Sequence, residues 1–335
     1  MKKLSPFFIA IFLFAMQISF AQNTDGEYRV LKTIPVDGNG GWDYLTVDKP
    51  TQRLFISHGT CVDVLDLNTD KLIGQIPNTP GVHGIACVPE LNKGFITAGR
   101  IDSVIVFDLK SLKVIDKVIT GKNPDAILYD AFSNRIFTFN GRGNSVTAID
   151  AKTNLVVGTI TVSGKPEAAV SNGKGKIFCN IEDKSTVVKF DAVTLKIDSE
   201  WPLEPGKEPS GLALDLKNDR LFSACSESNQ IVVMDAGSGK IIATLPMGEG
   251  CDGIIFIPGD RNAISSNGEG TLTVVHQDGP DKYKVVQTLA TRQRARTITY
   301  DETTKRIYLP SAEVIMENDK RRVMPGTFKI IVVSR

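Results

Sequence analysis

Seven polar positions recur along the chain at nearly equal intervals, and most of them carry side chains that can ionise or bind a metal. They are Asp43, His83, Asp125, Glu167, Ser210, Asp252 and Arg296. Successive members lie 40 to 44 residues apart. Such a regular spacing indicates that each residue has the same position in a repeated structural unit. In a closed ring of such units, we expect these side chains to converge on one channel mouth.

Four members of this set are carboxylates, which raise one another's pKa when they are crowded and no cation neutralises them. Arg296 supplies one positive charge, and a bound divalent metal is a second source, with Asp125, Glu167 and Asp252 as its expected ligands. Oxygen ligands suit Ca²⁺ or Mg²⁺, whereas histidines suit a softer metal such as Zn²⁺. No spacing selects among these metals. The alternative is a solvated rim without function, because loops are polar in any protein.

A second group of polar residues lies in the segments that we expect to connect the second and third strands of each repeat. These segments are Ser57-His58-Gly59, Gly99-Arg100, Asn140-Gly141-Arg142, Glu182-Asp183-Lys184, Ser226-Glu227 and Asn267-Gly268-Glu269-Gly270. They should emerge on the same face as the first group. We therefore expect His58, Asn140, Asn267 and Glu269 to line the wall of the ligand-binding mouth.

Two sequence anchors define the repeat that positions these residues. The first is a basic, an apolar and an aromatic residue in succession: Arg53-Leu54-Phe55, Arg135-Ile136-Phe137, Lys176-Ile177-Phe178, Arg220-Leu221-Phe222 and Arg306-Ile307-Tyr308, with weaker copies at Lys93-Gly94-Phe95 and Asn262-Ala263-Ile264. The second is an apolar residue followed by Asp: Leu65-Asp66, Phe107-Asp108, Ile149-Asp150, Phe190-Asp191 and Met234-Asp235. Short apolar runs bounded by turn residues predict four strands in each repeat. The sequence therefore predicts an all-β fold, a single seven-bladed β-propeller with four-stranded blades.

The two ends of the predicted domain complement each other. Residues 28–36 resemble the fourth strand of a repeat, whereas the last repeat offers strands near 297–301, 306–311 and 328–334 and no fourth. Pairing of the two ends would close the ring and remove open sheet edges. Residues 312–326 are a surplus within the last repeat. They form either a tolerated surface insertion or a flap over the channel mouth.

Residues 1–21 have the features of a secretory signal peptide: Lys2 and Lys3, then an apolar run, then Ser19 and Ala21 at the −3 and −1 positions. The alternative is an uncleaved membrane anchor, for which the apolar run is short. The expected product is a periplasmic or secreted monomer of residues 22–335, with no membrane span in the mature chain. The 39 basic and 38 acidic residues nearly balance, which argues against nucleic acid as a partner.

The chain has five cysteines, an odd number, and their spacings match no metal-binding motif. We expect Cys87 and Cys179 to lie inside strands as small apolar side chains. The prediction is that stability needs no disulfide.

The blade pattern resembles that of YVTN-repeat propellers, a WD-like repeat, and the chain looks like the YncE-like exported bacterial proteins of that family. The resemblance rests on Val233-Met234-Asp235, Gly206-Lys207-Glu208-Pro209-Ser210-Gly211 and Arg220-Leu221-Phe222, and it extends over essentially all of the mature chain. Phe178-Cys179-Asn180 matches the name-giving motif only approximately. The resemblance implies the fold, but a fold of this kind does not specify an activity.

Two hypotheses of function follow. The first is a non-catalytic binding protein or scaffold whose channel-mouth face holds a small molecule, a peptide or an envelope partner. The second is a metal-assisted, lactonase-like hydrolase in which His83 is the general base and Arg296 holds an anion. The chain has no Gly-x-Ser-x-Gly turn, no His-Glu-x-x-His motif and no phosphate-binding glycine loop. Cys251 with His83 as base is a further candidate nucleophile, and the catalytic residues are otherwise unknown.

Overall fold

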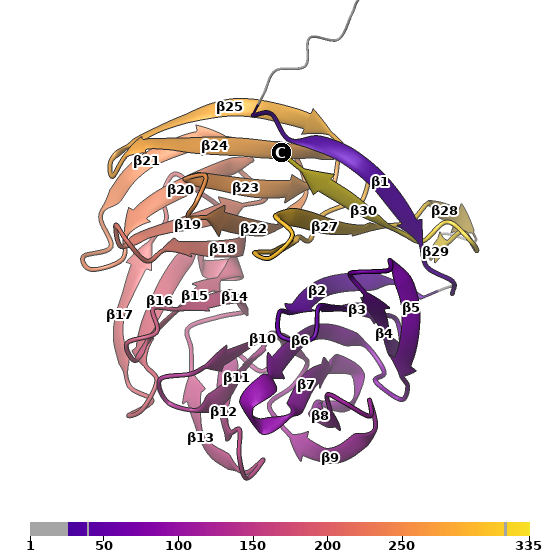
Figure 1. Ribbon diagram of the computed structural model, residues 1–335. Coiled ribbons are helices and arrows are strands. Elements are labelled where there is room, and N and C mark those ends of the chain that lie inside the picture. Colours follow the sequence, from indigo (N-terminus) through magenta and orange to yellow (C-terminus); the bar gives the residue numbers. More distant parts are fainter. Residues whose placement is uncertain (1–25, 39, 318–319) are drawn as a thin grey trace, which may run out of the picture.

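The computed structural model describes residues 26–38, 40–317 and 320–335, so the predicted signal peptide lies outside the described residues. The described chain forms seven four-stranded antiparallel sheets in a ring, together with one two-stranded hairpin (Figure 1). The prediction of an all-β, seven-bladed propeller is confirmed. Among the described residues, we find no helix that is long and apolar enough to cross a membrane.

The two inner strands of each blade surround the channel. The first strands are β2 (Trp42–Asp48), β6 (Val82–Val88), β10 (Pro124–Asp130), β14 (Pro166–Ser171), β18 (Pro209–Asp215), β22 (Cys251–Ile257) and β26 (Thr299–Asp301). The second strands are β3 (Arg53–His58), β7 (Lys93–Ala98), β11 (Arg135–Asn140), β15 (Lys176–Ile181), β19 (Arg220–Cys225), β23 (Asn262–Asn267) and β27 (Arg306–Ser311).

The two outer strands complete each blade. The third strands are β4 (Cys61–Asp66), β8 (Ser103–Asp108), β12 (Ser145–Asp150), β16 (Thr186–Asp191), β20 (Gln230–Asp235), β24 (Thr271–Gly279) and β30 (Lys329–Ser334). The fourth strands are β5 (Lys71–Ile76), β9 (Val114–Ile119), β13 (Val156–Thr161), β17 (Ile197–Pro202), β21 (Ile241–Pro246), β25 (Lys282–Ala290) and β1 (Arg29–Pro35). Short 3-10 turns are η1 (Pro89–Leu91), η2 (Gly99–Ile101) and η3 (Glu182–Lys184). We number the blades 1 to 7 in the order of their first strands.

Blade 7 joins the two ends of the chain. Its strand order is β26-β27-β30-β1, so the N-terminal strand is the outermost strand of the C-terminal blade. The pairing is antiparallel, with Thr33 opposite Ile331 and Ile34 opposite Ile330 (Figure 1). The predicted closure of the ring is therefore present, and it covers an edge of β30 that would otherwise be open.

The first sequence anchor recurs because its aromatic residue fills the space between neighbouring blades. Phe55 of blade 1 packs against Phe107 of blade 2 at a ring-centroid distance of 5.5 Å, and Phe137 of blade 3 packs against Phe190 of blade 4 at 5.7 Å. All four rings are fully buried. Burial of large aromatic side chains at each interface between blades supplies much of the hydrophobic stabilisation of a propeller.

The second sequence anchor recurs because its Asp organises the turn to the fourth strand. Asp66 Oδ1 accepts hydrogen bonds from the backbone N–H groups of Asn68 (2.9 Å) and Thr69 (2.8 Å) and from the Thr69 hydroxyl (3.0 Å). Asp150 makes the equivalent bonds with Thr153. These bonds lower the pKa of both carboxyl groups. The need for a carboxylate that holds this turn explains why the apolar-Asp pair recurs at a regular interval along the chain.

A bulge occurs near the start of the first strand in blades 1 to 6. In blade 1, Trp42 pairs with His58 and Leu45 pairs with Ile56, so Asp43 and Tyr44 together lie opposite one residue. Equivalent shifts of register occur in the other five blades. The predicted site residues of these blades are the second residues of their strands. Bulges commonly re-aim a side chain beside a functional site.

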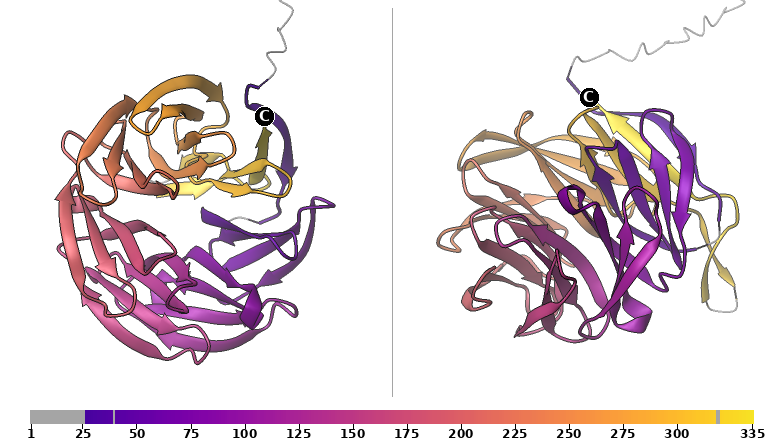
Figure 2. Two further views of the ribbon diagram at one scale, coloured as in Figure 1. Left: turned by 60° about the vertical axis from the view of Figure 1, so that its left-hand side comes forward. Right: turned by 60° about the horizontal axis from the view of Figure 1, so that its bottom comes forward.

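The surplus segment in blade 7 contains a β-hairpin made of β28 (Val314–Glu317) and β29 (Lys320–Val323). The hairpin projects from the ring, as the right-hand view of Figure 2 shows. At its base, the backbone N–H of Met324 donates to the carbonyl of Glu313 (2.8 Å), and Arg292 forms an ion pair with Glu313 (3.0 Å). These contacts attach the described part of the insertion to the ring.

Candidate functional site

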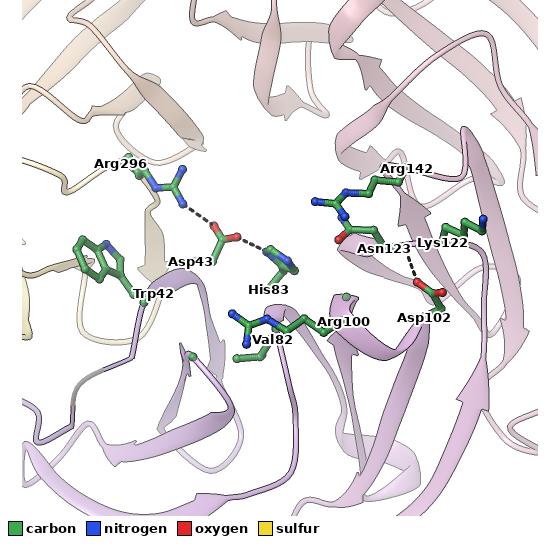
Figure 3. A pocket seen from close by; sticks show the side chains of 14 residues that line it. Trp42, Asp43, Val82, His83, Arg100, Asp102, Lys122, Asn123, Arg142 and Arg296 are labelled. Atoms are coloured by element: carbon green, nitrogen blue, oxygen red, sulfur yellow. Dashed lines mark hydrogen bonds and ion pairs between the residues drawn. The ribbon is translucent and has the colours of Figure 1, made fainter. Parts of the chain in front are cut away.

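A cavity of about 840 Å³ lies at the mouth of the channel. It is formed by the connections that precede the first strands and by those between the second and third strands. Trp42, Asp43, His83, Arg100, Arg142 and Arg296 are among the residues that line it (Figure 3). Figure 3 shows Arg296 on one side of Asp43 and His83, with Arg142 on the opposite side. We call this space the mouth cavity.

A chain of charged groups from five blades, which we call the floor, adjoins the mouth cavity. Asp43, His83 and Arg296 line the cavity, whereas Asp125 and Asp252 do not. His83 Nδ1 lies 2.7 Å from Asp43 Oδ2 and 3.3 Å from Asp125 Oδ1. Arg296 forms an ion pair with Asp252, and its second terminal nitrogen lies 3.8 Å from Asp43 Oδ1. The structure therefore brings together four residues whose even spacing indicated one position in the repeat, and links Asp252 to them through Arg296.

A second ion group in blade 4 contains Lys165, which the sequence reasoning missed. Lys165 Nζ lies 2.6 Å from Glu167 Oε1 and also forms an ion pair with Glu182. Lys165 precedes Pro166 at the start of the first strand. Gly-Lys pairs also occur at 121–122 and 206–207, but there the lysine lies two residues before the corresponding proline rather than one, so the repeat marks this position only approximately.

The pKa values of Asp125 and Glu167 are raised. Burial raises the pKa of Asp125 to about 6, with a further increase from the charge of Asp43 and a partial offset from His83. Burial together with the neighbouring charge of Asp125 raises the pKa of Glu167 to about 9, although Lys165 opposes the shift. Burial is the largest cause of both shifts, and the charges of neighbouring carboxylates add to it.

The pKa values of Asp252 and His83 are shifted as well. Burial raises the pKa of Asp252 despite the opposing charge of Arg296. Burial disfavours the charged form of His83, but Asp43 and Asp125 outweigh burial and raise the pKa of the imidazole. His83 should therefore keep its proton, as an imidazolium, to a higher pH than a free histidine does.

Hydrogen bonds between blades fix the backbone that carries these side chains. The Thr97 hydroxyl of blade 2 donates to the carbonyl of Asp125 in blade 3 (2.7 Å). The Thr297 hydroxyl donates to the carbonyl of Asp43 across the junction of blades 7 and 1 (2.6 Å). Both threonines are fully buried. A floor built on such rigid contacts can hold charged groups in fixed positions.

Three predicted wall residues have a different place in the blade. His58, Asn140 and Asn267 end their second strands and are buried. Each side chain bonds to the third strand of its own blade: His58 to Asp63 (2.7 Å), Asn140 to Thr147 (3.0 Å) and Asn267 to Thr273 (3.0 Å). None of the three lines the mouth cavity. Their shared position points to a structural role, in which a polar side chain holds the two central strands together.

Two other predicted residues also lie away from the cavity. The Ser210 hydroxyl donates to the backbone carbonyl of Cys251 in the next blade (2.5 Å), which is a contact between blades. Glu269 is exposed in its loop and accepts a hydrogen bond from the Thr271 hydroxyl (2.7 Å). Neither lines the mouth cavity. Ser210 has the same position in its repeat as the floor residues have in theirs, but its short side chain reaches only the neighbouring backbone.

Two groups of metal-ligating side chains occur among the described residues. One is Asp43, His83 and Asp125, and the other is His58, Cys61 and Asp63; in each group the ligand atoms lie within 4.8 Å of one another. The first group differs from the predicted metal ligands Asp125, Glu167 and Asp252, which do not meet that distance criterion as a set. The reason is that Lys165 and Arg296 hold Glu167 and Asp252.

Comparison with known proteins identifies the fold alone. No protein-family model and no curated protein sequence matches the chain. A solved chain from the crystal structure of a mitotic checkpoint complex is similar, with a TM-score of 0.76 and 11% sequence identity. The match covers 97% of this chain and 99% of that chain. At this identity the likeness shows a shared propeller architecture, and the YVTN resemblance stays a prediction.

The rim of the mouth cavity carries three cations and one carboxylate, Asp102, whose Oδ1 accepts from the backbone N–H of Asn123 (2.8 Å). Arg100, Lys122 and Arg142 line the mouth cavity and are exposed. In the described part of the chain, none of the three forms an ion pair with a carboxylate. The cavity therefore combines a fixed floor of paired charges with a rim of cations that are open to a ligand.

The cysteines do not supply a nucleophile for this cavity. Cys251 is fully buried, and burial raises the pKa of its thiol, which hydrogen-bonds to the carbonyl of Gly253 (3.3 Å). A reactive cysteine needs an accessible thiolate, so the arrangement does not favour Cys251 with His83 as base. All five cysteines are free thiols, and Cys87 and Cys179 lie in β6 and β15 as expected.

Proposed function

We propose that the chain is an exported binding protein that uses the mouth cavity to hold a small molecule or a peptide with an anionic group. The β-propeller supplies the scaffold, and export rests on the predicted signal peptide. The observation that carries the proposal is the contrast between the floor and the rim. Arg296 and Lys165 have carboxylate partners, whereas Arg100 and Arg142 face the cavity without one among the described residues.

The chemistry of the rim supports an anionic ligand. A guanidinium group offers a planar set of donors that matches a carboxylate or a phosphate. Arg100 and Arg142 come from different blades, so a ligand between them would contact both without requiring the floor to rearrange. A cavity of about 840 Å³ is within the usual range for small-molecule sites.

Titration calorimetry with a panel of organic carboxylates, phosphate esters and acidic peptides tests this proposal. The Arg100→Ala/Arg142→Ala double variant should bind the selected ligand at least tenfold more weakly, about 1.4 kcal/mol. Lys217→Ala, an exposed cation beyond β18 that lines no part of the mouth cavity, should bind as the parent chain does. Unchanged affinity in the double variant would exclude the rim as the binding site.

A second candidate function is metal-assisted hydrolysis, with the Asp43–His83–Asp125 group as its specific support. Carboxylate and imidazole groups at this separation suit a divalent ion, and such an ion polarises a carbonyl and activates water. Arg296 would then hold the anionic part of the substrate. Metal analysis after incubation with Ca²⁺, Mg²⁺ or Zn²⁺ separates the candidates. Less than about a tenth of an equivalent of any metal, with no turnover of lactones, counts against the hydrolase.

A further inference from the structure

We infer that the ligand of the mouth cavity is an acidic oligosaccharide, a short chain of sugar residues that carry carboxylates. The inference deepens the proposed binding function and rests on it. Its basis is that the mouth cavity and the cavity beside it together offer three kinds of contact: arginines for carboxylates, polar groups for hydroxyls and an indole for a sugar ring.

Trp42 supplies the flat apolar surface. It lines both the mouth cavity and a second cavity of about 640 Å³, which lies between the hairpin β28–β29 and the ring. The indole N–H donates to the carbonyl of Arg294 (3.3 Å), and the ring packs against Phe328 at a centroid distance of 5.8 Å. Trp42 is nevertheless only half-buried. A ring that is held in place and still open to two cavities suits the apolar face of a sugar.

Arginines line both cavities. Arg100 and Arg142 line the mouth cavity, and Arg294 and Arg322 line the second cavity. Arg322 forms an ion pair with Glu317, whereas Arg294, like the two rim arginines, has no carboxylate partner among the described residues. A ligand that contacts both sets enters both cavities, so it is an extended chain with more than one anionic group.

Asp102 and Asn123 give the mouth cavity a different chemistry. Both line it, and Figure 3 shows them across the cavity from Trp42. Asp102 Oδ1 accepts from the backbone N–H of Asn123, but Asp102 Oδ2 and the Asn123 side-chain amide have no hydrogen-bond partner in the described part of the chain. A carboxylate at the rim repels a simple anion, whereas it accepts a hydrogen bond from a hydroxyl group. These two residues therefore favour a ligand that carries hydroxyl groups near its carboxylates.

A uronic-acid residue combines the three features, because it carries a carboxylate, several hydroxyl groups and a ring with an apolar face. A run of acidic residues in a peptide satisfies the arginines but supplies neither a ring for Trp42 nor side-chain donors for Asp102. A nucleic-acid strand supplies rings and charges, but it stacks successive bases on several aromatic side chains. Trp42 is the one tryptophan, tyrosine or phenylalanine among the described residues that line the two cavities.

Calorimetry with tetrasaccharides tests the inference on the full mature chain. The ligands contain uronic acid and are prepared from pectate, alginate and hyaluronan. Their methyl esters keep the rings and hydroxyl groups but remove the charge, and tetraglutamate keeps the charge but has no rings. At least one uronate tetrasaccharide should bind at least about tenfold more tightly than its own methyl ester and than tetraglutamate.

A tryptophan variant assigns the sugar ring to its surface. Trp42→Leu keeps an apolar side chain against Phe328 but removes the flat ring. It should bind the selected tetrasaccharide at least about fivefold more weakly and leave the affinity for tetraglutamate unchanged. Trp201→Leu is the matched control, because Trp201 is half-buried on β17 and lines neither cavity, and it should change neither affinity.

A rim variant separates hydroxyl recognition from charge. Asp102→Asn keeps an oxygen for the backbone N–H of Asn123 but removes the negative charge and the free acceptor. It should weaken binding of the tetrasaccharide at least about threefold and strengthen binding of tetraglutamate, so the two affinities move in opposite directions. A melting curve confirms that each variant is folded, and the comparison of ligands on the unmodified chain does not depend on any variant.

Each result has a defined consequence. A smaller preference over tetraglutamate overturns the inference but leaves the anion-binding function standing, because charge alone then explains the binding. A smaller preference over the methyl esters overturns both, because the cavity then does not recognise an anion. If no uronate binds, the inference is overturned, and the simple carboxylates and phosphates decide the proposed function independently. A preference that is unchanged in Trp42→Leu and Asp102→Asn places the sugar elsewhere and also overturns the inference.

Discussion

His83 Nδ1 lies 2.7 Å from Asp43 and 3.3 Å from Asp125, so one imidazole contacts carboxylates of both neighbouring blades. The three residues are separated by about 40 positions each in the sequence, and each is the second residue of a first strand. The contact is possible because the bulge in each of these strands turns the side chain toward the same opening. The charge state of this triplet couples the ligand site to the interfaces of blades 1, 2 and 3.

Replacement of Asp125 by Asn should change the pH dependence of stability. The pKa of Asp125 is about 6 in the folded chain, compared with about 3.9 for a free Asp. Because the folded pKa is raised, ionisation disfavours the fold, and this penalty develops as the pH rises from about 4 to about 6. The quantity to measure is the melting temperature of Asp125→Asn minus that of the parent chain. We expect this difference to be several degrees larger at pH 8 than at pH 4.

The comparison of the two pH values removes every effect of the substitution that does not depend on pH, and it reports the joint titration of Asp125 and its neighbour His83. Glu227→Gln, at an exposed position in a loop on the same face, serves as the control, and its difference should not change with pH. A constant difference for Asp125→Asn over this range would show that the carboxyl group does not titrate with a raised pKa.

The sequence predicted the ring well because each anchor has one physical task in every blade. Phe55 and Phe137 fill the space between blades, and Asp66 and Asp150 hold turns. Because these contacts recur from blade to blade, the residue types that make them recur at the interval of the repeat. The same periodicity placed Asp43, His83, Asp125 and Arg296 at one opening. These predictions depend on the position in the repeat, which spacing alone can indicate.

Side-chain direction was harder to predict. His58 and Asn140 follow the repeat as well, but they end buried strands and point to the adjacent strand, where the chain needs a polar bridge. Lys165 occurs just before a bulge, and only the bulge brings it to Glu167 and Glu182. Spacing gives the position in a blade but not the local twist that decides which way a side chain turns.

Substitution of Thr97 by Val should destabilise the floor without changing side-chain shape. The Thr97 hydroxyl donates to the carbonyl of Asp125, in a partly buried contact, and accepts from the backbone N–H of Gly84 (2.8 Å), in a buried one. Loss of both leaves unsatisfied backbone groups and should cost about 2 kcal/mol, roughly 5 °C in melting temperature. Thr244→Val, exposed on β21, should melt within about 1 °C of the parent. Equal melting of the two variants would contradict the role of this bond.

Removal of the closing strand should expose a sheet edge. Deletion of residues 22–36 takes away β1 and leaves β30 of blade 7 without its outer partner. An open edge of this length favours pairing with other chains, so we expect an aggregating product in light scattering. A deletion of residues 22–25 alone is the control, because it leaves β1 in place. A soluble product of the longer deletion that melts cooperatively would disprove the closure argument.

Reducing agent should leave the stability of the chain unchanged. All five cysteines are free, and Cys179, Cys225 and Cys251 are fully buried in the blades. Loss of a native disulfide commonly costs 2–5 kcal/mol, which would lower the melting temperature by more than about 4 °C. We expect the two melting curves, with and without dithiothreitol, to agree within about 1 °C. A larger decrease would reveal a disulfide that contributes to stability.

The hairpin β28–β29 should affect ligand binding more than stability. A second cavity of about 640 Å³ lies between this hairpin and the ring, and it shares Trp42 and Arg296 with the mouth cavity. Val314 and Arg322 of the hairpin line it. A ligand that extends beyond the mouth would therefore contact the hairpin. This geometry favours the predicted flap over an inert insertion, although it does not require the hairpin to move.

Replacement of residues 314–323 by two glycines tests this role. The bond between Met324 and Glu313 would still close the base, so the melting temperature should fall by no more than about 3 °C. Affinity for an extended anionic peptide should fall at least fivefold, about 1 kcal/mol, while that for a single amino acid should stay the same. Met316→Ser, at an exposed position that lines neither cavity, is the matched control and should change neither quantity. Unchanged peptide affinity after the replacement would identify the segment as a surface insertion without a binding role.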